Sequence, residues 1–510
     1  MSEVNLPSEW IATELENIGD VVTGKTPSKN KPEYFGGDIP FIKPADVNDQ
    51  GEITLTDEHI TVLGAETVPL IPPGSIVVTC IGNLGRCAIT TARSATNQQI
   101  NSVLPSNKVD VKFLYYQLRT LKEWMLSESS ATTVTIINKS KFSKAPIICP
   151  PIAEQKVIAD KLDALLAQVE TTKACLERIP EILKTFRQSV LAAAVSGKLT
   201  QEWRNNNKDK VVIESDILLA HREQWEREKL QDFIKKGKQP SNENWKKKYK
   251  PPECFESEKT WATPTAWAWT SIDSIASVTK LAGFEFTKYV SYSESGEIPV
   301  LKAENVGKNG FKQTQYSRVS LRTVELLPRS ELFGDEILVT FVGAGVGQVA
   351  RVPKDQKYFL GPNIAVVRNS YSQFQSRFFE LLLSSNEGKA NLLSFSKGAA
   401  QPSLSMSQIR QTTIPLPHKD EQSEIVRRVE ELLAFADSIE QKANAALERV
   451  NNLTQSILAK AFRGELTADW RAANPELISG ENSAEALLGK IKADRAAMKP
   501  AKKKSARKKA

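Results

Sequence analysis

The chain has 510 residues, of which 40% are apolar and 25% charged, a composition typical of globular proteins with room for roughly three domains. Its net charge of +8 lies almost entirely in the last twelve residues, which hold seven Lys or Arg and no acidic residue, so charge alone does not indicate that the rest of the chain binds nucleic acid. No apolar run approaches the roughly 18 residues of a membrane span and SEVNLPSEW after Met1 lacks the apolar core of a signal peptide, so we expect a cytoplasmic protein.

Residues 1–150 are predicted to form a compact α+β domain. The short β-rich runs PFIKPADV, GEITLT, GSIVVTCIG and GRCAIT are separated by Gly and Pro, and a helical stretch follows from Val111. This alternation of strands and turns with one later helix favours a domain in which helices cover a small sheet.

Residues 151–204 are predicted to form a long helix with a coiled-coil seam. Apolar positions recur at steps of three and four over about four heptads. Pro180 lies inside this pattern and predicts a break or restart near Ile179, because proline cannot donate the backbone hydrogen bond of a helix interior. The seam residues are Leu162, Leu165, Val169, Leu176 and Leu183.

Residues 205–260 have the composition of a charged linker, and their middle part predicts a charged helix. Trp245 and Tyr249 alternate there with the lysines of Lys246 to Lys250, a pattern able to touch a phosphate backbone. Residues 261–413 then repeat landmarks of the first domain. IPFIKPADV and IPVLKAENV share an offset of 259 with Trp10 and Trp269, and IVVTCIG and ILVTFVG share one of 261.

The first helix is also repeated. The sequence from Glu421 to Arg471 matches that from Glu154 to Arg204 without a gap at an offset of 267, so the chain contains two copies of one unit. The second helix, residues 414–463, has its seam in the same register, and residues 464–510 form a C-terminal segment that ends in the basic tail. The second seam is Val429, Leu432, Ile439, Val450 and Leu453.

Two equal seams on one chain can pack on each other. We therefore predict an α+β protein with two pseudo-repeated α/β domains separated by two long helices that form an antiparallel coiled coil. A heptad helix that dimerises two chains is the simpler alternative, but the duplication already supplies a partner within the chain.

Catalytic motifs fail on their context. GDVVTGKT from Gly19 satisfies the P-loop pattern, but Pro27 and Pro32 follow where a helix should begin. FVGAGVG from Phe341 resembles a cofactor-binding glycine loop, but a second strand follows it, which favours a β-hairpin. The histidines are scattered, and the five cysteines form no CxxC pair, so we expect no metal site and no catalytic residues.

The arrangement and several motifs resemble the specificity (S) subunit of a type I restriction-modification system. The order of variable domain and repeated helix, with EQKVIADKLDALLAQV and EQSEIVRRVEELLAFADSIE, carries this resemblance. NNLTQSILAKAFRGELTADWR and NPELISGENSAEALL are similar to the enterobacterial type IA branch.

The resemblance implies a DNA-recognition subunit without catalysis of its own. Each variable domain would be a target recognition domain for one half of a bipartite, asymmetric site in double-stranded DNA. The helices would set the spacer and dock two methyltransferase (M) subunits, and with restriction (R) subunits the complex would cleave unmodified DNA in host defence. S-adenosylmethionine, ATP and Mg would then be bound by the partner subunits and not by this chain.

Base edges are read by Arg, Lys, Asn and Gln, so such residues on the loops of both domains are the candidates for DNA contact. The candidates are Lys25, Lys29, Lys31, Asn83, Arg86, Gln98 and Gln99 in the first domain, and Lys280, Lys288, Tyr289, Gln348, Arg351 and Asn363 in the second. Two other classes of function stay open: a stand-alone S-adenosylmethionine-dependent methyltransferase that uses FVGAGVG, and a coiled-coil scaffold for proteins, suggested by the nearly neutral body.

Overall fold

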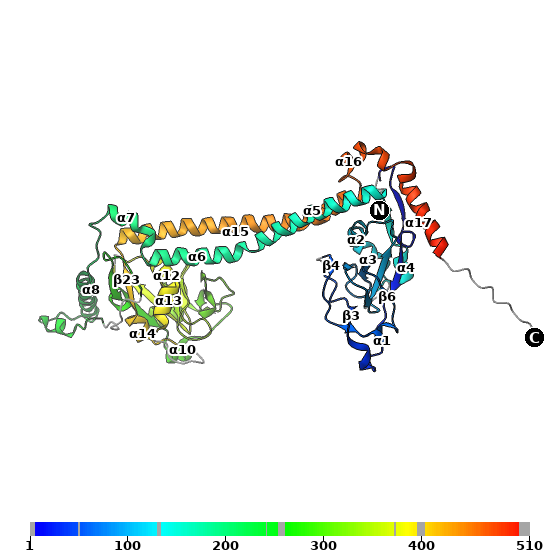
Figure 1. Cartoon of the computed structure of the whole chain (residues 1–510). Helices are drawn as coiled ribbons and strands as arrows, with labels where there is room; N and C mark the ends of the chain where they lie inside the picture. Colours follow the sequence, from blue (N-terminus) through cyan, green and yellow to red (C-terminus); the bar gives the residue numbers. More distant parts are fainter. Residues whose placement is uncertain are drawn as a thin grey trace, which may run out of the picture. The chain divides into compact units, whose positions relative to one another are not determined.

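The structure is a computed structural model of the chain (Figure 1). It describes residues 6–48, 51–129, 134–240, 242–252, 261–371, 374–394 and 403–498. The basic tail lies outside the described residues. The chain divides into two compact units, the first made of Met1–Glu177 with Asn444–Ala510 and the second of Arg178–Ala443, and they are described in turn.

The first unit is built on a five-stranded sheet in which the long strand β10 is antiparallel to both of its neighbours. The order of this sheet is β2 (Gly19–Thr23), β10 (Ile100–Pro105), β7 (Ile76–Thr79), β8 (Cys87–Thr90) and β4 (Glu52–Ile53). A four-stranded sheet has the order β5 (His59–Ile60), β3 (Phe35–Ile42), β9 (Ser94–Thr96) and β6 (Leu70–Ile71). A separate pair joins β1 (Ile11–Glu14) to β11 (Pro146–Cys149).

The helices of the first unit lie against both of its sheets, with contacts to β2 and β8 of one and to β3 and β5 of the other. They are η1 (Leu15–Asn17), η2 (Pro32–Tyr34), α1 (Val62–Ala65), α2 (Val111–Arg119), α3 (Lys122–Glu128), α4 (Lys139–Ser143), α5 (Ile152–Glu177), α16 (Ala468–Ala473), η7 (Pro475–Leu477), η8 (Gly480–Asn482) and α17 (Ala484–Met498). The main core joins Val78 of the sheet to Phe113, Leu162 and Leu458, so strands, α2, α5 and the end of α15 (Lys419–Phe462) share one apolar cluster.

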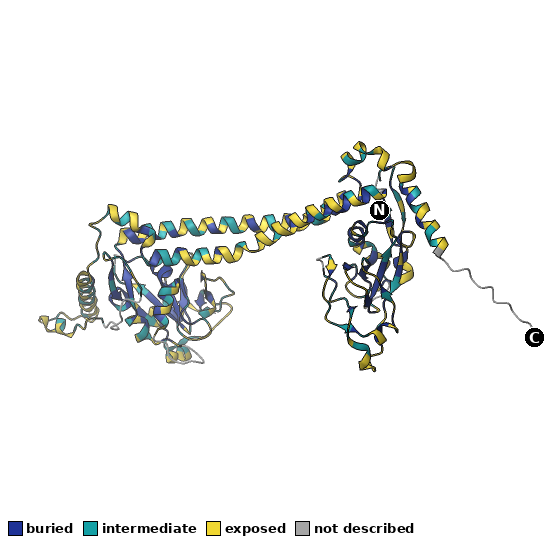
Figure 2. Cartoon of the chain, in the orientation of Figure 1, coloured by how far each residue is buried: buried dark blue, intermediate teal, exposed yellow. Residues whose placement is uncertain are grey.

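The second unit repeats this plan. Its main sheet has the order β13 (Ala276–Lys280), β22 (Ile364–Asn369), β19 (Ile337–Thr340) and β20 (Val349–Arg351). A second sheet has the order β17 (Arg318–Val319), β14 (Ile298–Leu301), β21 (Tyr358–Leu360) and β18 (Glu331–Leu332). The remaining pairs are β12 (Ala268–Ser271) with β23 (Thr413–Leu416), and β15 (Val306–Gly307) with β16 (Gly310–Phe311). The central strands of both units are buried (Figure 2).

Some helices of the second unit lie against β13, β19 and β20 of its main sheet, and the unit holds many helical elements. They are α6 (Ile179–Val195), η3 (Lys198–Thr200), α7 (Gln201–Asn206), α8 (Glu214–Lys235), η4 (Glu243–Lys248), α9 (Ile272–Ile275), α10 (Gly283–Tyr289), η5 (Ala303–Asn305), α11 (Leu321–Leu326), η6 (Pro328–Ser330), α12 (Ser376–Ser384), α13 (Asn386–Leu393) and α14 (Met406–Gln411). The core joins Val339 of the sheet to Phe378 of α12, Val190 of α6 and Val429 of α15.

The predicted break at Pro180 is confirmed. α5 ends at Glu177 and α6 begins at Ile179, which places Pro180 in the first turn of a new helix, where its missing N–H costs little. α15 has Leu447 at the matching position and continues without interruption, contributing residues 419–443 to the second unit and 444–462 to the first.

The helix pairs are antiparallel, as the seams predicted. In the second unit, Arg187 of α6 contacts Asp437 at 2.8 Å, while Leu199, farther along the chain, accepts a 2.8 Å hydrogen bond from Arg428, closer to the start of α15. In the first unit, Glu154 near the start of α5 contacts Thr467 just beyond the end of α15. The mixed helix and sheet content and the long helices agree with the predicted fold class.

The seam positions are not all equally covered. Leu162, Val169, Leu183, Val429 and Val450 are buried. The half-buried positions are Leu165, Leu176, Leu432 and Ile439.

One predicted seam residue is wrong, because Leu453 is 44% exposed. After Val450 the covered stripe continues through Thr454, Ile457 and Leu458. An α-helix has 3.6 residues per turn, so a strict seven-residue pattern drifts around it, and here the next covered position comes four residues on instead of three.

Candidate nucleic-acid interface

Loops of the first unit converge at one end of its main sheet. Thr23 pairs with Asn101 and Thr79 pairs with Ile100, so the ends of β2 and β7 lie beside the start of β10. The hydroxyl of Thr26 donates a 2.6 Å hydrogen bond to the side-chain oxygen of Gln98. The structure therefore brings five predicted contact residues to one edge: Lys25, Asn83, Arg86, Gln98 and Gln99.

The other two predicted lysines lie farther along the loop that leaves β2. Lys29 and Lys31 are exposed, and the ammonium of Lys31 lies 3.1 Å from the hydroxyl of Tyr34. The hydrogen bond with Tyr34 raises the pKa of the Lys31 ammonium above its ordinary value. The ammonium of Lys25 instead donates to the Thr67 carbonyl at 3.0 Å.

The β7–β8 and β19–β20 hairpins have the same backbone geometry, which confirms the predicted hairpins. The amide of Thr79 donates to Arg86 O at 2.9 Å, and the amide of Thr340 donates to Gln348 O at 3.0 Å. The turns use glycine at positive φ, with 81° at Gly85 and 77° at Gly347. Arg86 and Gln348 are therefore equivalent positions in the two units.

A second pair of predicted residues is also equivalent. The amide of Cys80 donates to Gln99 O at 2.8 Å, and the amide of Phe341 donates to Asn363 O at 3.1 Å. Asn363 is exposed and has a φ of 66°, a left-handed conformation that asparagine tolerates better than most residues. Equivalent loops thus present Gln99 in one unit and Asn363 in the other.

The remaining residues predicted in the second unit separate into two places. Lys280 ends β13 at the same edge as the hairpin, with its ammonium 4.9 Å from the centre of the Phe341 ring. Lys288 and Tyr289 lie in α10, where the Lys288 ammonium is 5.0 Å from the Tyr289 ring.

Arg351 does not join this group. It pairs with Ile337 at the start of β19, whereas the hairpin follows Thr340 at the other end of that strand. Its guanidinium lies 3.0 Å from Asp335 and 3.5 Å from Glu380, so intramolecular carboxylates already balance its charge. Its position after the hairpin in the sequence suggested a contact residue, but a strand that runs back along its neighbour carries it away from the turn.

Two basic residues that the sequence did not predict lie against the first hairpin. Arg119 at the end of α2 and Lys122 at the start of α3 line a cavity of about 460 Å³ together with Asn83, Arg86 and Gln455. None of the described residues that line this cavity is acidic. Their contact with the hairpin is long-range, so no local pattern in the sequence could have found it.

The second hairpin has a different neighbour. A Cβ atom at Gly85 would lie 3.2 Å from Lys122, whereas one at Gly347 would lie 2.9 Å from Leu393. The first hairpin therefore packs beside a cation and the second beside an apolar side chain, which makes the two otherwise similar edges chemically distinct.

A buried glutamate joins the helix pair to the domain in the first unit. Glu154 is fully buried and accepts hydrogen bonds from Trp10 Nε1 at 2.8 Å, Thr467 Oγ1 at 2.6 Å and Arg471 Nε at 3.0 Å. Arg471 also donates to the carbonyl of Gly464 at 2.7 Å, where the chain leaves α15. We call this arrangement the glutamate clamp.

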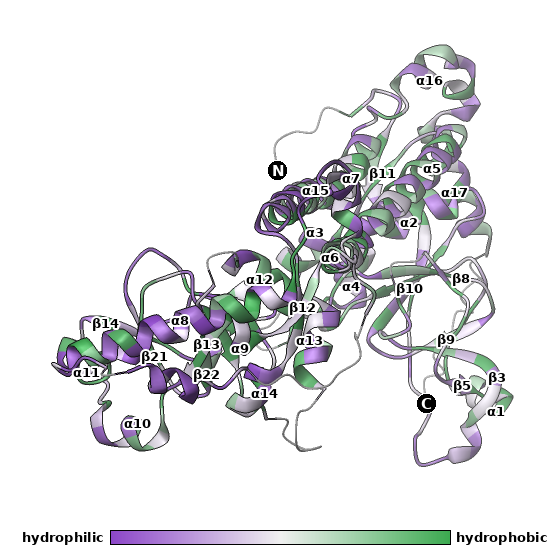
Figure 3. Cartoon of the chain, turned by 90° about the vertical axis from the view of Figure 1, so that its left-hand side faces the viewer, coloured by the Kyte–Doolittle hydropathy of each residue, from purple (hydrophilic) through white to green (hydrophobic). Residues whose placement is uncertain are grey.

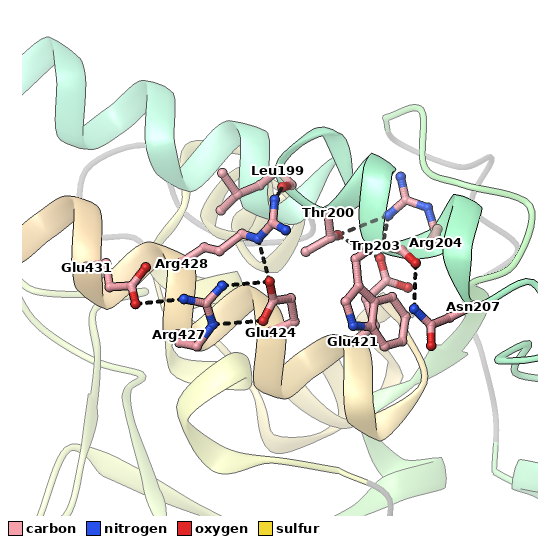
Figure 4. A network of polar contacts seen from close by, with 10 residues as sticks. All are labelled: Leu199, Thr200, Trp203, Arg204, Asn207, Glu421, Glu424, Arg427, Arg428 and Glu431. Carbon is pink, nitrogen blue, oxygen red and sulfur yellow. Dashed lines mark hydrogen bonds and ion pairs between the residues drawn. The ribbon is translucent and has the colours of Figure 1, made fainter.

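The same clamp recurs in the second unit (Figure 4). Glu421 is fully buried and accepts hydrogen bonds from Thr200 Oγ1 at 2.7 Å and Trp267 Nε1 at 2.8 Å, and it forms an ion pair with Arg204. The identity of glutamate, threonine and arginine in both sequence copies was the signal for this clamp, although their roles were not predicted.

The clamp corrects the alignment of the two domains. The counterpart of Trp10 is Trp267 and not Trp269, which instead donates to Thr263 at 2.9 Å. Ile11 pairs with Cys149 just as Ala268 pairs with Leu416, which fixes the offset at 257 here. Two tryptophans, Trp267 and Trp269, lie two residues apart in AWAW. The offset of 259, taken from strands later in the sequence, matched Trp10 to Trp269 and was therefore wrong here.

The glutamine after each clamp glutamate makes a second repeated contact. The side-chain oxygen of Gln155 accepts from the amide of Asp110 at 3.0 Å, and that of Gln422 accepts from the amide of Gln375 at 2.8 Å. Asp110 and Gln375 are the N-cap residues of α2 and α12. The long helices are thus bonded to the N-cap of a domain helix, α2 or α12, in the same way in each unit.

The rejected catalytic motifs have the structures expected of them. Gly19 begins strand β2, and the amides of Gly24 and Lys25 donate to carbonyls of Ile100 and Thr96 at 3.1 and 2.9 Å, so they are not free to cradle phosphate. FVGAGVG is the turn between β19 and β20.

Within the described residues, no three His, Cys, Asp or Glu side chains are grouped as metal ligands, and no helix is long and apolar enough to span a membrane.

Fold and site together define a class of protein: a duplicated chain in which two similar domains, with chemically different loop edges, are each fixed to an antiparallel helix pair. The profile of the type I restriction modification DNA specificity domain matches residues 7–181 and 264–449. The chain belongs to this family of type I restriction-modification specificity subunits, which confirms the resemblance seen in the sequence.

The chain is similar to named relatives over nearly its whole length. It is 34% identical to the type I restriction enzyme EcoBI specificity subunit of Escherichia coli over 97% of this chain and 94% of that protein. It is 32% identical to the Escherichia coli EcoDI specificity subunit over 98% of each chain. The HsdS subunit from Thermoanaerobacter tengcongensis has a similar fold, with a TM-score of 0.59 at 16% identity over 91% of this chain and 99% of that one.

Proposed function

We propose that this chain recognises DNA for a type I restriction-modification complex, and that each domain reads one half of a bipartite, asymmetric site. The observation that carries the proposal is the pair of equivalent loop edges that differ in their side chains. Arg86 stands where the second unit has Gln348, and Gln99 stands where it has Asn363. Arginine pairs well with guanine and glutamine or asparagine with adenine, so Arg86 and Gln348 would prefer different bases, whereas Gln99 and Asn363 would both suit adenine.

The basic cavity of the first unit would hold the DNA backbone beside the reading loop. Arg119 and Lys122 add positive charge next to Asn83 and Arg86, and no acidic residue lines the described part of the cavity. Phosphate contacts fix the position and orientation of a protein on the duplex, while base contacts give specificity. The lysines of the same unit, Lys25, Lys29 and Lys31, would extend this positive edge.

The helices would set the distance between the half-sites and dock two methyltransferase (M) subunits, to which restriction (R) subunits add. S-adenosylmethionine, ATP and Mg would be bound by those partners, and the assembled complex would cleave unmodified DNA in the cytoplasm. The near-complete coverage of specificity subunits by this chain supports the assignment. The basic tail would add contacts to phosphates that do not depend on sequence.

The alternative of a stand-alone methyltransferase has less support. A glycine-rich cofactor loop is followed by a helix whose amides face the ligand, whereas FVGAGVG leads directly into β20. Crosslinking of labelled S-adenosylmethionine to the purified chain alone would favour that alternative. The scaffold alternative predicts that the chain co-purifies with other proteins but protects no DNA.

Footprinting tests the proposal. The chain is co-expressed with its methyltransferase subunit, and the complex is incubated with a library of duplex DNA before nuclease digestion. We expect protection of two short blocks separated by a constant gap. A single protected block, or no protection, would exclude recognition of a bipartite site.

A further inference from the structure

The segment between the first helix pair and the second domain folds into a helical hairpin on the second unit. α8 is anchored at its start by Ile217, which is fully buried in the core of this unit, and by the amide of Val212, which donates to Ala266 O at 3.1 Å. The chain then returns through η4 beside α8. The predicted charged linker therefore contains two helical elements, α8 and η4, and α8 is anchored at its start on the second unit (Figure 1).

An aromatic cluster holds η4 against α8. The rings of Trp225 and Trp245 are stacked with centres 5.9 Å apart, and Tyr249 meets Trp225 edge-on at 5.5 Å. Phe233 meets Trp245 edge-on at 6.0 Å, and the hydroxyl of Tyr249 lies 3.0 Å from Nδ1 of His221. These aromatic faces are used inside the hairpin, so they do not form an open platform on which unpaired bases could stack.

The second half of the hairpin in sequence, residues 229–250, is strongly basic, and it folds back along α8, where Lys246 lies 3.7 Å from Glu226. Residues 229–250 contain eight lysines and two acidic residues, a net charge of +6. Lys229 lies 4.0 Å from Asp232 and Lys246 lies 2.7 Å from Glu243, so both acids already have partners. The other lysines are exposed and make no ion pair with any part of the chain that the structure describes: Lys235, Lys236, Lys238, Lys247, Lys248 and Lys250.

A corresponding helix follows the clamp of the first unit. α17 packs on η1 with Leu487 and Ile491 buried, just as α8 packs on α9, and η1 and α9 occupy equivalent places after β1 and β12. The sequence after α17 is again rich in lysine and arginine. A helix followed by a basic segment is thus part of the repeated plan.

We propose that the α8–η4 hairpin binds the phosphate backbone of duplex DNA without reading its sequence. This inference rests on the proposed function. Lysine is a compact, strongly hydrated charge on a flexible stem, suited to phosphates, and it is depleted in protein interfaces. Six exposed lysines that make no ion pair with the described part of the chain complement a duplex that carries one negative charge per roughly 1.7 Å. Much of the α8 ribbon has the colour of hydrophilic residues in Figure 3.

The test measures how salt weakens DNA binding by the full-length chain co-purified with its methyltransferase subunit. One double variant is Lys247→Gln with Lys248→Gln, and a second is Lys235→Gln with Lys236→Gln. The control, Arg227→Gln with Lys229→Gln, removes the same charge from α8 at residues that pair with Glu223 and Asp232. Affinity is measured on the protected site and on an unrelated duplex between about 50 and 200 mM salt.

The slope of log affinity against log salt should fall by about 0.9 for each phosphate that the variant no longer neutralises, so either double variant should reduce the slope by up to about 1.8. The reduction should be equal on both duplexes, the protected blocks should not move, and the control should change the slope by less than half as much. Unchanged slopes would overturn the inference. If the variants with unchanged slopes also lost the methyltransferase subunit, the hairpin would instead be a surface that docks protein. A wild-type complex that protects no two-block site, but whose slope still falls in the variants, would contradict bipartite recognition and leave phosphate binding by the hairpin standing.

Discussion

Removal of the charge of one clamp glutamate should loosen one unit and leave the other intact. In Glu421→Gln, an amide replaces a fully buried carboxylate, and the guanidinium of Arg204, whose side chain is only 15% exposed, loses its counter-charge. Loss of one partner from a buried ion pair costs about 3–5 kcal/mol. Because Arg204 is partly exposed and glutamine keeps one acceptor oxygen, we expect about 2–3 kcal/mol here.

The duplication supplies a matched control. Glu154→Gln should cost about the same amount in the first unit, because its carboxylate has the same three kinds of donor. Trp267→Phe removes the indole N–H bond, worth about 1 kcal/mol, and also shrinks a buried ring that meets Phe378 edge-on and lies under the Arg204 guanidinium, so it should cost more than that bond alone.

The assay is hydrogen exchange followed by mass spectrometry. A two-unit protein has no single free energy of unfolding, whereas exchange reports the local opening of each segment. Glu421→Gln should speed exchange in β12 and α7, and Glu154→Gln in β1 and α16. A cost below about 1 kcal/mol, or an equal effect of one substitution on both units, would refute the claim that each glutamate clamp stabilises its own unit.

Three further outcomes follow from the structure. Arg86→Ala should weaken binding by about 1–3 kcal/mol through one half-site only, whereas Arg351→Ala, whose partners are Asp335 and Glu380, should leave base preference unchanged in a binding selection. Insertion of seven residues into α5 should change the gap between protected blocks or abolish binding without changing either half-site, and a changed base preference in footprinting would contradict this. Hydrogen bonds from Arg427 and then Arg428 hold the pKa of Glu424 at about 2, below its ordinary 4.5, so its stabilisation is present above pH 4.5 and disappears as the pH falls through 2. Acid unfolding of Glu424→Gln should lack that component.

The helices were predictable because their pattern is local. Heptad spacing indicated two helices able to pack on each other, and Pro180 indicated the break between α5 and α6. The prediction for Leu453 was wrong because the side chains of a strict seven-residue repeat gradually rotate around a helix of 3.6 residues per turn. Thr454, and not Leu453, is therefore the next covered residue after Val450. The choice of Trp269 failed because strand register, and not the spacing of tryptophans, decides which indole reaches the clamp.

The loops at the end of each main sheet were only partly predictable. Glycine spacing indicated both hairpins, and hence the equivalence of Arg86 and Gln348. Arg351 follows the hairpin in the sequence, but it lies at the end of β20 that is far from the turn. Its position in the sequence did not show this. Arg119 and Lys122 were missed because α2 and α3 meet the hairpin through tertiary packing.

The hairpin of α8 and η4 shows the same limit. Its charge indicated a solvated linker, and a helix in its middle part was predicted, but the stacking of Trp225 on Trp245 joins residues that are twenty positions apart. Such a contact is visible only after the chain has folded back.

The central claim is that each domain reads its own half-site. Replacement of residues 261–413 by the corresponding domain of the EcoBI specificity subunit, followed by footprinting of the complex on a DNA library, tests it most directly. One protected block should change its sequence while the other block and the gap stay the same. A change in both blocks would contradict it.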